Sequence, residues 1–96
     1  MTVYLIAELN INDRERYGHY AAGFMDIFSK YEGKLLSVDE SVQVLEGEWG
    51  CTRTVLIEFP SETSARDWYE SDEYQQLAKH RLAASTANLV LLKGLA

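Results

Sequence analysis

Two carboxylates lie on segments with the alternating pattern of strands, where they could transfer protons. Glu8 belongs to residues 3–9 and Glu58 to residues 53–59. If these strands are neighbours at the centre of a sheet, we expect the two carboxylates to lie near each other on its open face. Burial and like charge would then favour the protonated form of one, as a general acid or base requires. The structural alternative is that each pairs with an arginine or lies at the solvated end of a barrel.

Arg53, at the start of the second segment, is a candidate ligand-binding residue. Its planar guanidinium could bind a ligand carboxylate through two N–H groups. Trp49, at the tip of the loop formed by residues 47–50, could cover the same pocket or dock on a partner. An ion pair of Arg53 with Glu46 or Glu48, or stacking on Trp49, accounts for the arginine equally well.

His19 is the better placed of the two histidines for proton transfer, because an imidazole exchanges its proton near neutral pH. Tyr17 and Tyr20 lie close to it in sequence and could hold a substrate. The competing interpretation is a solvated histidine at the rim of a helix. His80, beside the polar side of a later helix, is expected to be solvated.

Residue types that bind metals and cofactors are sparse. The chain has one cysteine, Cys51, and two histidines far apart, so none of the usual metal-ligand spacings is present. It also lacks a glycine-rich phosphate loop and the GxSxG motif. A haem would need an axial histidine facing the interior, for which His19 is the candidate. We therefore expect neither a metal nor a cofactor.

The elements that must position these residues follow the order β-α-β-β-α-β. Extended patterns cover residues 3–9, 34–38, 53–59 and 88–93, and residues 42–46 resume the second strand. Helical spacing covers residues 14–31 and the region after Pro60, where Ser61 and Ser71 are N-cap candidates. This order predicts one α+β domain over residues 1–96 with the ferredoxin-like fold. Its four-stranded antiparallel sheet would carry the helices on one face.

Helical spacing also identifies core candidates. Gly33 is a candidate left-handed cap for the first helix, and Trp68 with Tyr69 should pack between helix and sheet. Arg81 is expected at the edge of the last helix's stripe. The stripes predicted to be buried comprise Tyr17, Tyr20, Ala21, Phe24, Ile27, Phe28 and Tyr31 in the first helix, and Tyr74, Leu77, Ala78 and Leu82 in the last.

The sheet face without helices would expose apolar side chains, among them Tyr4, Ile6 and Leu56. So large an apolar surface is unusual on a stable monomer. We expect a second copy to cover it, so that two sheets facing each other enclose a barrel. The expected partner is therefore another copy of the chain.

Charge and composition exclude several function classes. Fifteen acidic and nine basic residues give a net charge of −6, which disfavours nucleic acid and anionic membrane surfaces as partners. No apolar run approaches the roughly 20 residues of a membrane-spanning helix. A single cysteine excludes an intrachain disulfide, and residues 1–10 lack the features of a signal peptide. We expect a cytoplasmic protein.

A set of spaced residues runs over nearly the whole chain. It comprises Leu45-Glu46-Gly47-Glu48-Trp49, Arg53, Ile57-Glu58-Phe59-Pro60-Ser61, Ala65, Trp68-Tyr69, Ser71, Glu73-Tyr74 and Arg81. In this combination the chain resembles the DUF1330 family of small bacterial proteins. The resemblance implies a dimeric α+β barrel and little about activity, because the family is one of unknown function. Many relatives carry a proline after the tryptophan, where this chain has Gly50-Cys51-Thr52.

Two functions follow from these observations. The first is a cofactor-free enzyme that performs proton transfer or oxygenation on a small organic molecule, as the wider dimeric α+β barrel superfamily suggests by analogy. Arg53 would anchor the ligand, and Glu58 or His19 would move the proton. The second is a non-catalytic protein, either binding a small ligand or serving as a structural dimer. Tyr20, Trp49 and Glu8 complete the candidate ligand-binding set.

Overall fold

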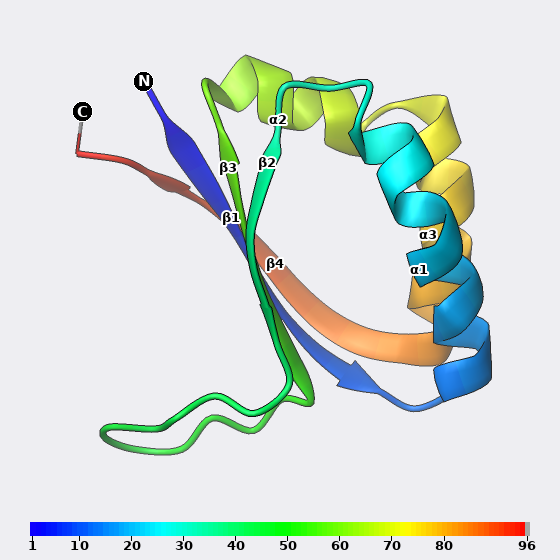
Figure 1. Ribbon diagram of the computed structural model, residues 1–96, viewed down its shortest axis with the longest axis vertical. Coiled ribbons are helices and arrows are strands. Elements are labelled where there is room, and N and C mark those ends of the chain that lie inside the picture. Colours follow the sequence, from blue (N-terminus) through cyan, green and yellow to red (C-terminus); the bar gives the residue numbers. More distant parts are fainter. Residues whose placement is uncertain (96) are drawn as a thin grey trace.

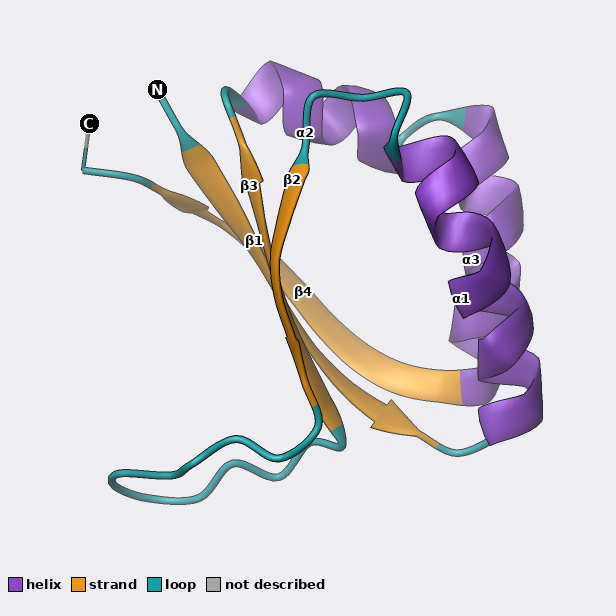
Figure 2. Ribbon diagram, viewed as in Figure 1, coloured by secondary structure: helices purple, strands orange, loops and turns teal. Residues whose placement is uncertain are grey.

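The computed structural model describes residues 1–95 of the chain. In this range, three helices cover one face of a four-stranded antiparallel sheet (Figures 1 and 2). The strands lie in the order β2-β3-β1-β4, and the α+β, ferredoxin-like fold predicted from the sequence is confirmed. The elements in chain order are β1 (Val3–Ile11), α1 (Arg14–Phe28), β2 (Lys34–Asp39), β3 (Arg53–Phe59), α2 (Glu62–Tyr69), α3 (Asp72–Ala84) and β4 (Ser85–Lys93).

Strand β1 lies at the centre of the sheet and fixes which side chains face the helices. It pairs with β3 from Val3↔Phe59 to Leu9↔Arg53, and with β4 from Val3↔Lys93 to Ile11↔Ser85. Because side chains alternate along a strand, Val3, Leu5, Ala7 and Leu9 share the helix-covered face and are buried there. Arg53 shares this face, since it lies opposite Leu9.

Each helix begins at a side chain that accepts a backbone N–H. Asp13 Oδ1 accepts from the Arg16 N–H at 3.0 Å and caps α1. Ser61 Oγ accepts from the Ser64 N–H at 3.1 Å, and Ser71 Oγ accepts from the Tyr74 N–H at 3.2 Å. These contacts confirm both serines as N-caps, each satisfying a backbone donor that the first helical turn leaves free.

Several predicted boundaries were wrong. Helix α1 ends at Phe28, because the next backbone N–H groups form tighter i→i+3 bonds, such as Tyr31 N–H to Phe28 O at 3.0 Å. Residues 42–46 form no strand, because β3 begins at Arg53 and pairs with β2 no further than Asp39↔Thr54. Strand β4 begins three residues earlier than the pattern suggested, since Ser85 pairs with Ile11.

The core is an aromatic cluster centred on Trp68, which is only 1% exposed. Its ring centroid lies 4.3 Å from that of Tyr74, 5.6 Å from Phe28 and 5.7 Å from Phe59. The tryptophan of α2 therefore joins β3, α1 and α3. Three residues predicted to be buried are exposed: Ala21, Tyr69 (38% exposed) and Leu82 (65% exposed). Leu82 is exposed because Arg81 continues the buried row of α3 in its place.

Gly33 is required for space and not for a left-handed turn. Its φ angle is not positive, so the predicted glycine cap was wrong, and Ser29 caps α1 instead. A Cβ at Gly33 would lie 2.5 Å from the Phe28 ring and 2.6 Å from the Phe59 ring. The glycine thus lets the turn before β2 pass across two core aromatic rings.

We expect Gly33→Ala to lower the free energy of unfolding by about 1–3 kcal/mol, as overpacked cores do. The matched control is Gly18→Ala within α1, where a Cβ meets nothing within 4 Å. That change should stabilise the protein by up to about 1 kcal/mol, because alanine favours helix over glycine. Urea unfolding of both variants measures the contrast, and equal effects of the same sign would contradict it.

The sheet face without helices carries apolar side chains in register. Tyr4 lies opposite Leu92, and Ile6 lies between Leu56 and Val90. Val90 and Leu92 are 53% and 49% exposed.

Among the described residues, no helix is both long enough and apolar enough to cross a membrane.

Candidate ligand-binding site

A cavity of about 190 Å³ lies between the inner face of the sheet and the helices. Its opening lies between α1 and β2: Met25 on α1 and Leu35 and Val38 on β2 line the cavity and are themselves exposed. Helix α1 packs on α3 and leaves this edge of the sheet uncovered. The apolar walls include Leu5, Ala7, Leu9, Phe24, Ile57 and Leu89.

Polar groups reach this apolar space from several elements. The hydroxyls of Tyr20 on α1 and Tyr74 on α3 form a buried hydrogen bond of 2.8 Å. Burial, with the neighbouring Tyr74, holds the pKa of Tyr20 far above its ordinary value, so this hydroxyl keeps its proton. Tyr17 lines the same space. Burial raises the pKa of Tyr17, although the positive charge of Arg53 acts in the opposite direction. Tyr17 and Tyr20 are therefore neutral hydrogen-bonding groups in the cavity wall.

Three buried N–H groups in residues 1–95 lack a hydrogen-bond partner: Arg53 Nε, Trp68 Nε1 and Arg81 Nε. All three residues line the cavity. Buried donors in folded proteins are nearly always satisfied, so each such exception needs an explanation. The three nitrogens themselves are almost inaccessible, so they lie behind the cavity wall to which their side chains contribute.

Arg81 is the most unusual of the three, because its side chain is charged and only 5% exposed. Its guanidinium carbon lies 6.0 Å from the centre of the Tyr20 ring. Its place in the last turn of α3 favours a cation through the helix dipole. No aspartate or glutamate in the described chain forms an ion pair with it.

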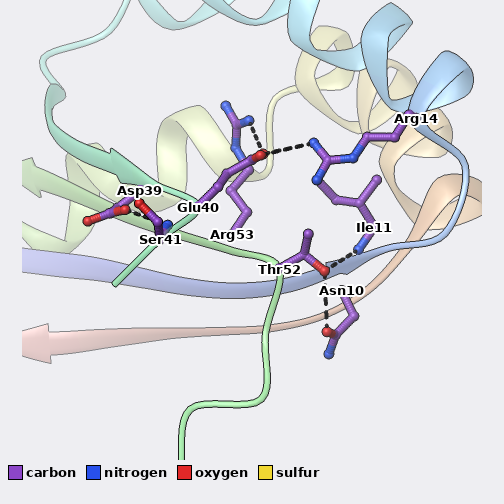
Figure 3. A network of polar contacts seen from close by, with 8 residues as sticks. All are labelled: Asn10, Ile11, Arg14, Asp39, Glu40, Ser41, Thr52 and Arg53. Atoms are coloured by element: carbon purple, nitrogen blue, oxygen red, sulfur yellow. Dashed lines mark hydrogen bonds and ion pairs between the residues drawn. The ribbon is translucent and has the colours of Figure 1, made fainter. Parts of the chain in front are cut away.

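Arg53 differs from Arg81 because it has an acidic partner. Glu40 Oε2 accepts from Arg53 Nη1 at 3.0 Å and from Arg14 Nη1 at 2.9 Å (Figure 3). The network joins the start of α1, the residue after β2 and the start of β3. Arg53 also lies over Tyr17, with its guanidinium carbon 5.4 Å from the ring centre. The partners considered for Arg53 from the sequence, Glu46, Glu48 and Trp49, were therefore wrong.

Glu40→Gln should lower stability at neutral pH and have little effect in acid. Hydrogen bonds from Arg14 and Arg53 hold the pKa of the Glu40 carboxyl below its ordinary value. A carboxylate with a depressed pKa stabilises the fold above the range in which an unfolded glutamate protonates, about pH 4, and loses this effect as the pH falls further. Urea unfolding between pH 7 and pH 3 should show the wild-type advantage shrinking. Glu48→Gln, in the exposed loop, is the control, and a difference that does not change with pH would contradict the prediction.

The chain that forms this cavity matches a known sequence family. A family model described as "Domain of unknown function (DUF1330)" matches residues 2–95. The chain belongs to the DUF1330 family. The resemblance drawn from its spaced motif is thereby confirmed, and the family description assigns no activity. None of the curated proteins matches this chain in sequence.

Solved structures share the fold of this DUF1330 chain. The RPA0582 protein of unknown function from Rhodopseudomonas palustris is 19% identical, with a TM-score of 0.82 over 99% of this chain and 83% of that one. SnoaB from Streptomyces nogalater, a cofactor-independent oxygenase, is 12% identical, with a TM-score of 0.69 over 99% and 94%. An ethyl tert-butyl ether d family protein from Bacillus halodurans is 19% identical, with a TM-score of 0.68 over 99% and 100%. At these identities the likeness shows the fold alone.

The candidate site residues of the DUF1330 chain separate into two groups. Arg53 and Tyr20 line the cavity. Glu8 and Glu58 point to the other face of the sheet, since they lie opposite Thr54 and Tyr4. Strands β1 and β3 are neighbours as expected, but these pairs are four positions apart, roughly 13 Å along the strand. The expected proximity of the two carboxylates was therefore wrong.

His19 and Trp49 also lie away from the cavity. His19 is exposed on α1, with its ring centre 5.7 Å from that of His80, which accepts a 3.3 Å hydrogen bond from Arg16 Nε. Trp49 is 46% exposed and donates its indole N–H to Thr54 Oγ1 at 2.8 Å. Roles for His19 and Trp49 in a ligand site stay predictions.

Sequence reasoning missed Arg81, Tyr74 and Trp68 as polar groups of the cavity. A signal was present: Tyr74, Ala78 and Arg81 are spaced four and three residues apart, so the arginine continues an apolar helical row. A charged residue at such a position indicates a buried cation.

In residues 1–95 no cluster of three or more histidine, cysteine, aspartate or glutamate side chains could hold a metal.

Proposed function

We propose that this DUF1330 protein binds a small organic molecule in the cavity between the sheet and α1, α2 and α3. The observation that carries the proposal is an apolar cavity whose wall includes two arginines and three tyrosines and, among the described residues, no aspartate or glutamate. An apolar cavity of about 150 Å³ accommodates benzene. A volume of about 190 Å³ therefore suits a ligand with a single substituted ring or a branched chain of similar size.

A thermal-shift screen of single-ring compounds, with cavity-filling variants, tests this proposal. A ligand that binds only the native state raises the melting temperature. Ala7→Leu should abolish the shift, because Ala7 lines the cavity and is buried. Ala22→Leu, at an exposed position on α1, should retain it. Shifts that survive Ala7→Leu unchanged would place the binding site elsewhere.

We further propose that the protein works as a homodimer in the cytoplasm. The apolar row on the uncovered face, with Tyr4, Ile6, Leu56, Val90 and Leu92, suits a second copy that turns two facing sheets into a barrel. Glu8 and Glu58 would then lie inside this barrel. A single cysteine and the absence of any possible intrachain disulfide suit a reducing compartment.

Sedimentation measurements at micromolar concentration test the dimer. Leu92→Glu places a charge on the uncovered sheet face and should give monomers. Leu82→Glu, on an exposed part of α3, is the matched control and should leave the dimer intact. A wild-type monomer at this concentration would end the dimer proposal.

A second candidate function is a cofactor-free enzyme, favoured by the shared fold with SnoaB, a cofactor-independent oxygenase. Arg53 and Tyr20 would hold a substrate in the cavity, whereas Glu58 and His19, which lie outside the cavity, would move a proton only on a substrate bound in the dimer barrel or at the helix surface. Once a ligand is known, its turnover by Glu58→Gln and His19→Ala decides the assignment. Unchanged turnover in both variants would remove these residues from any mechanism.

A further inference from the structure

The charges around the cavity do not balance. Two arginines line it, and no aspartate or glutamate of the described residues does so. Glu40 offsets the charge of Arg53 from outside the lining, whereas Arg81 has no such partner. Arg81 therefore places a positive charge without an acidic partner in the cavity wall.

An uncompensated buried guanidinium is costly, because removal of a charge from water is repaid only by a partner and by hydrogen bonds. The Tyr20 ring and the end of α3 supply part of this compensation. The unpartnered Nε of Arg81 and Nε1 of Trp68 show that hydrogen bonds are still lacking. An anionic group in the cavity would provide the missing negative charge.

We propose that the ligand is a small apolar carboxylate, with its head group bound by Arg81 and its apolar body against the sheet. This inference rests on the proposed function, since it names the ligand class of the same cavity. A monoanion would supply the acidic partner that Arg81 lacks, and the planar guanidinium matches the two oxygens of a carboxylate. The small volume and apolar walls suit one ring or a branched chain.

The neighbouring polar groups define how the head group is held. The Tyr20–Tyr74 hydroxyl pair can donate one hydrogen bond to the head group, because only one of its two protons is used between the two hydroxyls. Arg53 is committed to Glu40 through Nη1, so it borders the site but does not provide its free charge. Arg81 is thus the anchoring residue, a role that the sequence motif alone did not assign.

Matched pairs of acids and amides test the inference, with binding measured by calorimetry at pH 7. The probes are benzoate with benzamide, phenylacetate with phenylacetamide, and 3-methylbutanoate with 3-methylbutanamide. We expect at least one acid to bind at least about tenfold more tightly than its amide, as a charge-assisted hydrogen bond implies. Equal or tighter binding of the amides would overturn the carboxylate inference and leave the proposed function standing. Absence of binding by every probe would overturn both.

Variants then identify the anchor. Arg81→Met should bring the ratio of acid affinity to amide affinity close to one while the amides still bind. Arg81→Lys should restore part of the preference for the acid. Glu62→Gln, at a residue that does not line the cavity, should retain the full ratio. Far-UV circular dichroism confirms that each variant is folded. Full acid preference in folded Arg81→Met would overturn the role of Arg81.

Discussion

Replacing Trp68 with alanine is expected to lower the free energy of unfolding by about 3–5 kcal/mol, as truncation of a buried tryptophan does. Trp68 is 1% exposed and contacts aromatic rings from α1, β3 and α3. Its removal leaves a cavity where three elements meet, and few neighbours can move to fill it. Since domains of this size are stable by about 5–15 kcal/mol, the variant should be close to unfolding at 37 °C.

The adjacent residue provides the control for Trp68. Tyr69 is also aromatic and on α2, but it is 38% exposed. Tyr69→Ala should lower the free energy of unfolding clearly less than Trp68→Ala does, because much of the Tyr69 surface already contacts water. Urea unfolding at one protein concentration measures both variants, since association would otherwise alter the apparent stability. Equal losses would show that Trp68 is not the centre of the core.

Arg81→Met is expected to stabilise the ligand-free protein, by about 1 kcal/mol or more, while weakening carboxylate binding. A buried charge without an acidic partner opposes folding, and an apolar side chain of similar length removes this cost. Methionine also fits irregular space through its flexible chain. Opposite effects on stability and affinity are typical of residues kept for function.

Arg66→Met provides the comparison for Arg81. Arg66 is exposed on α2 and pairs with Glu62 and Glu70 at i±4, so its replacement should change the stability little. Thermal and urea unfolding of the two variants without ligand give the contrast. A strong loss of stability in Arg81→Met would instead show that the guanidinium holds the fold through Tyr20 and the end of α3.

The strands and caps followed from local patterns. Alternation places the side chains of β1 and β3 correctly. Ser61 and Ser71 were identifiable as N-caps because a short side-chain hydroxyl before an acidic first turn can accept a free backbone N–H of that turn. The ends of α1 and β2 depended on partners distant in sequence. Residues 42–46 have a strand's composition, but no strand lies beside them.

The site could be predicted only in part, because it depends on register and packing. Arg53 was identifiable from its place on a strand, but its partner Glu40 is brought near by β2 pairing with β3. Glu8 and Glu58 share a face of the sheet but lie at different positions along the strands, and only the register of strand pairing determines this separation. Arg81 looked peripheral because the helix rotation that buries it is set by contacts with α1 and the sheet.

The long loop between β2 and β3 is fastened at both of its bases. Glu40 at one end binds Arg14 and Arg53, and Thr52 at the other donates its N–H to Leu9 O at 2.8 Å. Its tip extends away from the helices, with Leu45 almost fully exposed (Figure 1). Because one of these anchors is Arg53, which lines the cavity, we expect changes at the loop tip to reach the cavity wall only through the loop bases.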